Sequence, residues 1–430
     1  MKVNANIILF LCLLFLPFLS EAQTEKSKVI KETFPLNAQG KITITHRRGP
    51  IYIKPSLDGQ TTVTATIKVR GDHATDVQKA LDNIKIDFEA SGNFLNVRSG
   101  DNIKNWVTIL NKSKVTFVNG AVVSGIKDIH IELAVNVPKT IALDLTNKYD
   151  NIFLADHTGD LRVDLYDADL NAESCQNLYL KLKYGKGYLH EVKNATLELY
   201  DSHLDLKKAQ SIDATVKYSN LNWGDLQKLK LISYDSKYII GNVLGETTIE
   251  DKYSEFSMGN IQNATLNLYD ANLVMGQADQ INLNSKYCHI KGVKAAKITL
   301  NESYDDEVEF QELNEFWTKS KYTKYIIGKV NSSVIMDTYD DEFNIAELGS
   351  ELQELNITGK YLKFQSKLNA AAELHLQANT KYGQLNYPQS RAEVRVHKEK
   401  NDDLELDVMI GKNVSGRKGV INCYDCKISF

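Results

Sequence analysis

The chain has 430 residues, of which 43% are hydrophobic and 25% are charged, and its formal net charge is −4. This is the balance of a large folded protein, and without a basic excess it offers no electrostatic footprint for nucleic acid or anionic lipid. Five cysteines are few for an exported chain of this length, so disulfides are not expected to be what holds it together.

Residues 1–22 are predicted to be a signal peptide. Lys2 opens a short basic region, an apolar run of about 13 residues follows from Ile7 to Leu19, and Ser20-Glu21-Ala22 supplies small residues where a signal peptidase cleaves. The run is too short to span a membrane as a helix, and no later stretch is longer or more apolar. The mature chain is therefore expected to begin near Gln23, to carry no transmembrane segment, and to be exported to the periplasm, the outer cell envelope or the medium.

Residues 23–145 are expected to form a β-rich N-terminal domain. Its strand-like runs surround one helix-like stretch, Ala74 to Asn83. We expect this domain also to cover the open edge of the repeats that follow, because uncovered strand edges invite aggregation. The predicted strands are 41–45, 51–54, 61–70, 84–88, 94–98, 107–118 and 129–137.

From residue 146 to 383 a tyrosine returns roughly every 17 residues, and two local patterns alternate. This period is too short for a pair of helices and predicts an all-β fold, a β-solenoid with two coils in each repeat of about 35 residues. In one pattern Lys precedes the tyrosine: Lys148-Tyr149, Lys183-Tyr184, Lys217-Tyr218, Lys252-Tyr253, Lys286-Tyr287 and Lys321-Tyr322. In the other Asp follows it: Tyr166-Asp167, Tyr200-Asp201, Tyr234-Asp235, Tyr269-Asp270, Tyr304-Asp305 and Tyr339-Asp340.

Apolar residues keep the same period and predict two short strands in each coil. One column of core residues is expected at Leu204, Leu221, Tyr238, Phe256, Leu273, Ile290 and Val308, and a second lies two residues later, on the same face of a strand. Glycines follow the second strand at Gly224, Gly241, Gly259 and Gly276, where we expect corners with positive φ.

The alternation of the two patterns predicts a specific stacking of side chains. Lys should lie over Tyr, as Lys217 over Tyr200 or Tyr234, and Tyr218 should lie beside Asp201 or Asp235. Such a register offers cation–π contacts and hydroxyl-to-carboxylate hydrogen bonds. The tyrosine-rich face is then either a structural ladder or a surface that binds a glycan or a protein of the envelope or cell surface.

Two acidic clusters two coils apart interrupt this regularity, and the intervening segment around Trp317 is interpreted as an insertion. The candidate ligand face is Asp305, Asp306, Trp317, Asp340 and Asp341. The alternative is that the carboxylates are solvated corner residues. A calcium-binding tape is not expected, because carboxylates on alternate coils cannot share one ion.

Residues 384–430 lose the strict period and are predicted to cap the solenoid. They contain Cys423 and Cys426, whose spacing fits a local disulfide, simple buried thiols, a redox pair or half of a metal site. No second Cys/His pair lies near them in sequence to complete a metal site.

Catalytic motifs are absent from the sequence. The nine histidines are scattered without metal-ligand spacing, and there is no nucleophile elbow, phosphate loop or dinucleotide fingerprint. We therefore expect no catalytic residues, no metal and no cofactor. The enzyme alternative is a carbohydrate-active β-helix with carboxylates in an open groove.

The segment from Asn147 to Leu154 (NKYDNIFL), its looser echo from His46 to Ile53, and the units Lys183-Tyr184-Gly185 and Lys381-Tyr382-Gly383 resemble the bacterial putative-adhesin families of exported β-solenoid domains. The resemblance implies a cell-envelope or cell-surface protein with a non-catalytic role in adhesion or scaffolding. A carbohydrate-active enzyme or a glycan-binding module is the alternative. Arg48 stands where the echo would have Tyr, and no binding residue is carried over.

Overall fold

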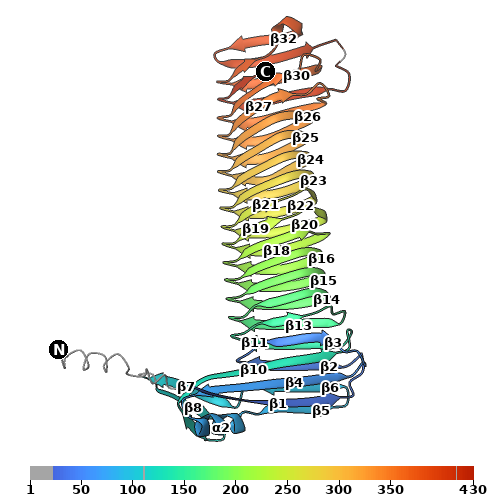
Figure 1. The fold of residues 1–430 in the computed structure, drawn as a ribbon. Helices are drawn as coiled ribbons and strands as arrows, with labels where there is room; N and C mark the ends of the chain where they lie inside the picture. Colours follow the sequence, from blue (N-terminus) through green and yellow to red (C-terminus); the bar gives the residue numbers. More distant parts are fainter. Residues whose placement is uncertain (1–22, 110–111, 413) are drawn as a thin grey trace, which may run out of the picture.

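The computed structural model describes residues 23–109, 112–412 and 414–430, and it is a long β-solenoid (Figure 1). Strands make up 73% of the chain and helices 3%, with about 13 turns of about 18 residues each. The all-β solenoid predicted from the repeat is confirmed. The predicted signal peptide, residues 1–22, lies outside the described residues. No helix within the described ranges has the length and apolar character needed to cross a membrane.

Each coil of the body consists of a first strand, a tight turn and a second strand. The first strand β18 (Lys228–Tyr234), for example, leads through a turn at Asp235 into the second strand β19 (Lys237–Ile240). Both strands pair in parallel with the equivalent strands of the coils below and above. The backbone hydrogen bonds therefore run along the solenoid axis, which explains why proline is missing from the body.

Where a second strand continues into the next first strand, the two form one long element. The body contains β11 (Ala142–Lys148), β12 (Ile152–Leu154), β13 (Asp160–Tyr166), β14 (Leu170–Lys183), β15 (Lys186–Tyr200), β16 (His203–Lys217), β17 (Asn220–Asp225), β18, β19, β20 (Val243–Lys252), β21 (Glu255–Met258), β22 (Ile261–Tyr269), β23 (Asn272–Lys286), β24 (His289–Tyr304), β25 (Glu307–Lys321), β26 (Lys324–Tyr339), β27 (Glu342–Leu348), β28 (Glu354–Lys360) and β29 (Lys363–Leu368).

The predicted core columns are confirmed. Leu204, Leu221, Tyr238, Phe256, Leu273 and Ile290 are register partners in successive coils, and each is at most 3% exposed. In the second column Gly292 faces Phe310, and a Cβ atom at Gly292 would lie 2.2 Å from the Phe310 ring. The small residue in one coil therefore makes room for the large one in the next.

The corner glycines have a different role from the one predicted. Gly224, Gly241, Gly259 and Gly276 are not among the residues with positive φ. Instead, a Cβ atom at Gly224 would lie 1.9 Å from the carbonyl oxygen of Lys207 in the preceding coil, and Gly241 and Gly259 meet backbone in the same way. These positions require glycine because consecutive backbones approach too closely for a side chain.

The N-terminal region pairs directly into the solenoid. It contains β1 (Thr24–Phe34), β2 (Lys41–Arg47), β3 (Ile51–Pro55), β4 (Thr61–Gly71), α2 (Ala74–Asn83), β5 (Ile86–Ser91), β6 (Phe94–Ser99), β7 (Ile103–Ile109), β8 (Lys112–Phe117), β9 (Val122–Ser124) and β10 (Ile126–Val137). The predicted helix is confirmed, β1 was not predicted, and the single strand expected over 107–118 belongs to the hairpin of β7 and β8.

Within this region β2 and β3 already form a coil, since they pair in parallel with β11 and β12. The turn between them places Arg48 at φ 72°, the backbone conformation of the tyrosine turns. Five further strands lie beyond this coil: β10, β4 and β1 extend the sheet from β3, and β6 and β5 extend it from β2, while β7, β8 and β9 form a separate sheet. Antiparallel pairing among these strands covers the first coil, as expected.

The C-terminal segment does more than cap the stack. It contains β30 (Leu374–Lys381), β31 (Gln384–Asn386), the 3-10 helix η2 (Gln389–Arg391), β32 (Ala392–Lys400), β33 (Asp403–Ile410), β34 (Lys418–Tyr424) and β35 (Lys427–Ser429). Strand β34 pairs in parallel with β28 on one side and with β30 on the other, and β35 lies between β29 and β31. The last coil in sequence is thus inserted beneath the preceding one. Antiparallel β33 and β32 then close the end.

Candidate functional site: the tyrosine turns

Each tight turn contains one residue in the left-handed region, and the two sequence patterns differ in which residue this is. In the Lys-Tyr coils it is the tyrosine, with φ between 54° and 69°, and in the Tyr-Asp coils it is the aspartate, with φ between 46° and 56°. Aspartate tolerates this conformation, whereas it costs a bulky residue such as tyrosine roughly 1–2 kcal/mol. Repeated strain of this kind indicates that the tyrosine ring is needed where it lies.

The left-handed residue also decides which side chains point outward. In a strand successive side chains alternate between the two faces, but at the turn two consecutive residues point out and the next points in. Tyr304 and Asp305 are exposed, for instance, and Asp306 is 4% exposed. A tyrosine at either of the two outward positions therefore reaches the same corner of the solenoid.

As a result, fifteen tyrosines form one continuous column, which we call the tyrosine column. Neighbouring rings in the column meet edge to face, with centroids 5.4–6.1 Å apart and interplanar angles of 77–89°. Thirteen of the rings are between 36% and 63% exposed. In stacking order the column is Tyr149, Tyr166, Tyr184, Tyr200, Tyr218, Tyr234, Tyr253, Tyr269, Tyr287, Tyr304, Tyr322, Tyr339, Tyr361, Tyr424 and Tyr382.

The alternation of the two patterns explains the edge-to-face geometry. Rings from one backbone position in every coil would stand directly above one another, whereas rings from alternating positions approach at a large angle. Aromatic quadrupoles favour the edge-to-face arrangement, which contributes about 0.5–1.5 kcal/mol per pair beyond burial. The column therefore offsets the backbone strain of the turns.

The predicted register is confirmed, but the contacts within it differ. Lys217 pairs with Tyr200 and Tyr234. Within the column, however, only Lys286 lies over tyrosine rings, 4.8 Å from Tyr287 and 4.9 Å from Tyr304, and among the described residues no column hydroxyl donates to an aspartate. Ring-to-ring contact along the column has largely replaced the expected cation–π and hydroxyl-to-carboxylate contacts.

A shallow groove, the tyrosine groove, follows the column on the outer face of the first strands. One stretch, of about 870 Å³, extends from Lys217 to Tyr304, and the next, of about 770 Å³, continues from Glu302 to Tyr424. One wall alternates Tyr and Lys along the axis, and the other carries mixed polar residues. The second wall contains Ile232, Glu250, Asn267, Asn284, Glu302, Lys319, Asp337, Thr358 and Asn422. The groove is thus aromatic and polar, and its lysines outnumber its carboxylates.

Inside the corner, the residue after the left-handed one is buried and often polar. Its side chain accepts a hydrogen bond from the backbone of the preceding coil: Ser219 Oγ accepts from the Ser202 amide, Ser236 Oγ from the Ser219 amide, and Ser254 Oγ from the Ser236 amide, at 3.0–3.1 Å. This inner turn row satisfies amides that the tight turn would otherwise leave without partners. It supports the tyrosine column from behind.

The structure separates the four aspartates of the predicted ligand face. Asp305 and Asp340 occupy the exposed left-handed positions, at φ 55° and 56°. Asp306 and Asp341 belong to the inner turn row and are 4% and 2% exposed. A ligand on the surface cannot reach these two carboxylates, so their place in the candidate face is corrected, and the alternative of solvated corners fails for them as well.

Asp306 and Asp341 are held by hydroxyls and amides. Asp341 accepts from the Thr323 amide and the Ser320 hydroxyl, both at 2.7 Å, and Asp306 accepts from Ser285 and Ser303 at 2.7 and 2.6 Å. Burial raises the pKa of both carboxyl groups, although these hydrogen bonds act to lower it. The pKa of Asp341 is raised to about 6. The two groups therefore belong to the packing of the corner.

Trp317 does not lie in an insertion. It is an outward-facing, half-buried residue within β25 and pairs with Thr299 and Ile335 in regular register. It lies on the same outer face as the tyrosine groove but does not line it. Because strands β25 and β26 are continuous, the interpretation of the segment around Trp317 as an insertion is wrong.

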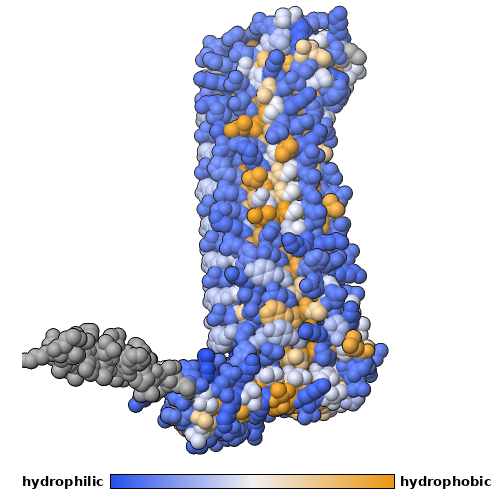
Figure 2. All heavy atoms as spheres, viewed as in Figure 1, coloured by the Kyte–Doolittle hydropathy of each residue, from blue (hydrophilic) through white to orange (hydrophobic). Residues whose placement is uncertain are grey.

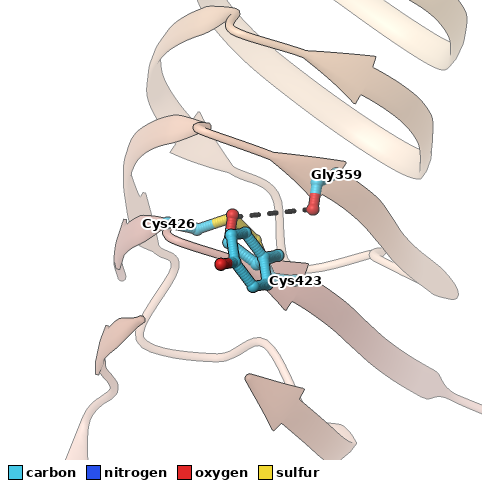
Figure 3. The surroundings of a disulfide bond; sticks show 4 residues. Gly359, Cys423 and Cys426 are labelled. Carbon is cyan, nitrogen blue, oxygen red and sulfur yellow. Dashed lines mark hydrogen bonds between the residues drawn. A yellow bond between two sulfur atoms is a disulfide. The ribbon is translucent and has the colours of Figure 1, made fainter. Parts of the chain in front are cut away.

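Cys423 and Cys426 form a local disulfide, which is one of the alternatives that the spacing allowed (Figure 3). The bond links the inward residues on either side of the Tyr424-Asp425 turn, and Cys426 Sγ lies 3.8 Å from the carbonyl oxygen of Gly359 in the adjacent coil. In the body the same two positions hold residues such as Ser233 and Ser236. Cys175 and Cys288 are buried free thiols.

In the part of the chain that the structure describes, no three His, Cys, Asp or Glu side chains converge in a way that could hold a metal ion. The tyrosine column, the groove and the buried corner residues therefore remain as the features from which a function can be argued.

The chain matches no known protein family and no curated protein. Similar solved structures include a putative adhesin from Bacteroides fragilis, at 14% identity, 63% coverage of this chain, 97% of that chain and TM-score 0.25. A putative cell adhesion protein from Clostridium sporogenes shares 8% identity over 94% of this chain and 96% of that one, at TM-score 0.17. A putative lipid binding protein from Parabacteroides distasonis shares 10% identity over 80% and 92%, at TM-score 0.19. Similarity at these levels carries no argument about a ligand.

Proposed function

We propose that this protein is an exported component of the cell envelope or cell surface that serves adhesion or scaffolding without catalysis. The observation that carries the proposal is the tyrosine groove, which repeats the same aromatic and polar lining every two coils. A surface of this kind fits an extended partner with its own repeat, a glycan chain or a surface protein. Many weak contacts then add up along the axis.

The exposure of the tyrosine rings supports a binding role beyond stability. A ladder needed only for packing gains nothing from rings that stay more than a third exposed, whereas exposed aromatic faces supply contact area at little cost in conformational entropy. Lysine ammonium groups on one wall and carboxylates and amides on the other offer donors and acceptors on both sides. The groove can therefore fix the orientation of a polar chain.

The absence of catalysis is part of the proposal. The described turns are short and similar, and the two predicted carboxylates with a raised pKa lie inside the solenoid. A carbohydrate-active enzyme would need exposed carboxylates on either side of a scissile bond. This alternative is kept as an outcome of the experiment below.

Export is tested by the N-terminus of the mature protein. Mass spectrometry of protein purified from the producing cell should find a chain that begins near Gln23 and carries no lipid. An intact Met1 on envelope material would overturn the proposed route of export.

Binding is tested on a glycan array and on whole cells, beside a lyase and hydrolase assay on the same glycans. The variant Tyr234→Asn with Tyr269→Asn removes two rings that line the groove, at positions outside the left-handed residue of the turn. Tyr179→Asn is the matched control, because Tyr179 is a surface tyrosine of the first-strand face outside the column.

We expect saturable binding without product, weakened at least tenfold by the double variant and unchanged by the control. Product release would establish the enzyme alternative. Equal binding by the double variant would remove the tyrosine groove as the site.

A further inference from the structure

A second aromatic row lies on the outer face of the second strands, near the base of the solenoid. It is formed by the residue four positions after each left-handed residue, and its successive members are Tyr52, Phe153, Asn171, Tyr188 and Asp205. The Tyr52 and Phe153 rings stack in parallel, with centroids 4.9 Å apart and planes 11° from each other. This row thus begins as a stack of rings in register with the coils.

Asn171 interrupts the stack by one coil. Since neighbouring strands lie about 4.8 Å apart, Phe153 and Tyr188 are separated by roughly 9.6 Å, which leaves space for one ring between them at the spacing of the Tyr52–Phe153 pair. Among the described residues no ring contact joins Phe153 to Tyr188, and Tyr188 is 41% exposed. A hollow of about 770 Å³ is found at this place, lined by all four residues from Tyr52 to Tyr188 in the row.

The polar lining of the hollow limits what can occupy it. Among the described residues the side-chain amide of Asn171 has no hydrogen-bond partner, so both its donor and its acceptor are available to a ligand. Lys54 and Lys207 on the rim are balanced by Glu173 and Asp205. An uncharged ligand with hydroxyl groups suits this balance better than an ion.

The surroundings set this site apart from the rest of the face. Figure 2 shows apolar side chains gathered in a stripe along the solenoid axis, and exposed residues of the second-strand region such as Ile239 and Val274 contribute apolar surface farther up. In the row, these two positions are aliphatic, and their neighbours Asn222, Ser257 and Lys291 are polar. Among the residues that the structure describes, two aromatic rings of the row flank a small polar residue at the base alone.

We propose that this hollow binds one uncharged pyranose ring of a glycan, held between Phe153 and Tyr188 above Asn171. The axial C–H groups of the sugar lie against the two aromatic faces, and its equatorial hydroxyls bond to the Asn171 amide and the charged rim. The sugar takes the place of the ring that the row lacks at this coil. The site is independent of the tyrosine groove and of the function proposed for it.

The experiment uses saturation-transfer difference NMR on the full mature chain. The probes are the methyl glycosides of glucose, galactose and N-acetylglucosamine, with N-acetyl-phenylalanine amide as the aromatic probe. Asn171→Phe fills the empty place with a protein ring and should block binding while raising the melting temperature. Val274→Phe is the matched control, because it adds the same ring at the equivalent position of a distant coil.

We expect at least one glycoside to show transfer to its ring-face protons in the wild type and in Val274→Phe, and at least a tenfold loss in Asn171→Phe. Retained transfer in Asn171→Phe, or no glycoside signal in the wild type, overturns the proposal. Transfer to the phenylalanine amide alone, lost in Asn171→Phe, would also overturn it and assign the hollow to an aromatic side chain of a protein partner.

Discussion

In the body of the solenoid each coil lies on the coil that precedes it in sequence, whereas at the C-terminal end the stacking order departs from the chain order. Strand β28 pairs with β34, whose residues lie 64 positions further along the chain than their partners (Glu354 with Lys418, for example), and β30 pairs with the other side of β34. The body is thus assembled from neighbours in sequence. The end is assembled by inserting the last coil between two others.

The tyrosine column shows what decides this difference. Lys360-Tyr361 and Lys381-Tyr382 have the same pattern, so in direct contact they would place two tyrosines at the same backbone position. Tyr424-Asp425 supplies the alternating pattern, and its ring meets both neighbours edge to face. The alternation is therefore a matching rule for adjacent coils, and it holds at the end because the C-terminal coil is inserted.

Removing residues 415–430 should have the largest effect. It exposes the faces of β28 and β30 and deletes inward residues such as Ile421 and Ile428, each contributing about 1.5–3 kcal/mol by burial. We expect the local stability of 374–410 to fall by about 5 kcal/mol, measured by hydrogen exchange. Peptides from the body coils are the internal control, because a solenoid is stabilised mainly between neighbouring coils. Unchanged protection of β30 and β33 would contradict the matching rule.

In the body, Leu273→Asp should be the most damaging single substitution. Leu273 is 1% exposed within the core column, so a carboxylate there is buried without a partner. We expect a loss of about 3–5 kcal/mol in denaturant unfolding. The adjacent Asn272→Asp, at an exposed position, should change stability by less than about 0.5 kcal/mol. A parent-like midpoint for Leu273→Asp would mean that the column is not buried.

Asp341→Asn tests the difference between the buried inner turn row and the exposed outer residues of the same turn. The carboxyl group has a raised pKa of about 6 because of burial, so the folded protein holds this proton more tightly than the unfolded chain does. Its contribution to stability is present at low pH and is lost as the pH rises through about 6. The expected loss is on the order of 3 kcal/mol between pH 4 and pH 7.

The variant should flatten this part of the pH profile, measured as melting temperature against pH. Asp340→Asn is the control, since it changes the exposed neighbour in the same turn. If both variants gave the parent profile, the inner turn row would not be the source of the dependence.

The smallest expected effect is that of Cys423→Ser with Cys426→Ser. The disulfide closes a very short loop, for which the chain-entropy contribution is about 2 kcal/mol. Because Ser233 and Ser236 occupy the same two positions in the body, the serine variant should keep the turn and lose only this amount. Differential scanning calorimetry of the parent with and without a reductant gives the same comparison. If neither the serine substitutions nor the reductant changed the melting temperature, the disulfide would add nothing to the stability of the packed coil.

Much of the fold could be predicted because its signals are local and periodic. The helix at Ala74–Asn83 and the core column through Leu273 follow from hydrophobic patterns within a few residues. The role of the corner glycines could not be predicted. Gly224 is required because a side chain there would collide with a backbone carbonyl of the preceding coil, which only the stacked structure reveals. The insertion of the last coil left one signal in the sequence: the Lys-Tyr pattern occurs twice in succession, at Tyr361 and Tyr382. This signal can be interpreted only after the ring contacts show that adjacent coils need alternating patterns.

The sequence by itself determined the period and the two inward columns, but it placed the positive-φ corners at the glycines and not at the Tyr and Asp residues where the tight turns lie. Only the tertiary structure decided that Asp305 points to solvent while Asp306 points inward, that fifteen tyrosines share one column, and that β34 lies beneath β30. The physical reason is the left-handed residue. It interrupts the two-residue alternation on which sequence patterns depend, so the direction of each side chain beyond it follows from the backbone conformation and from the coil stacked against it.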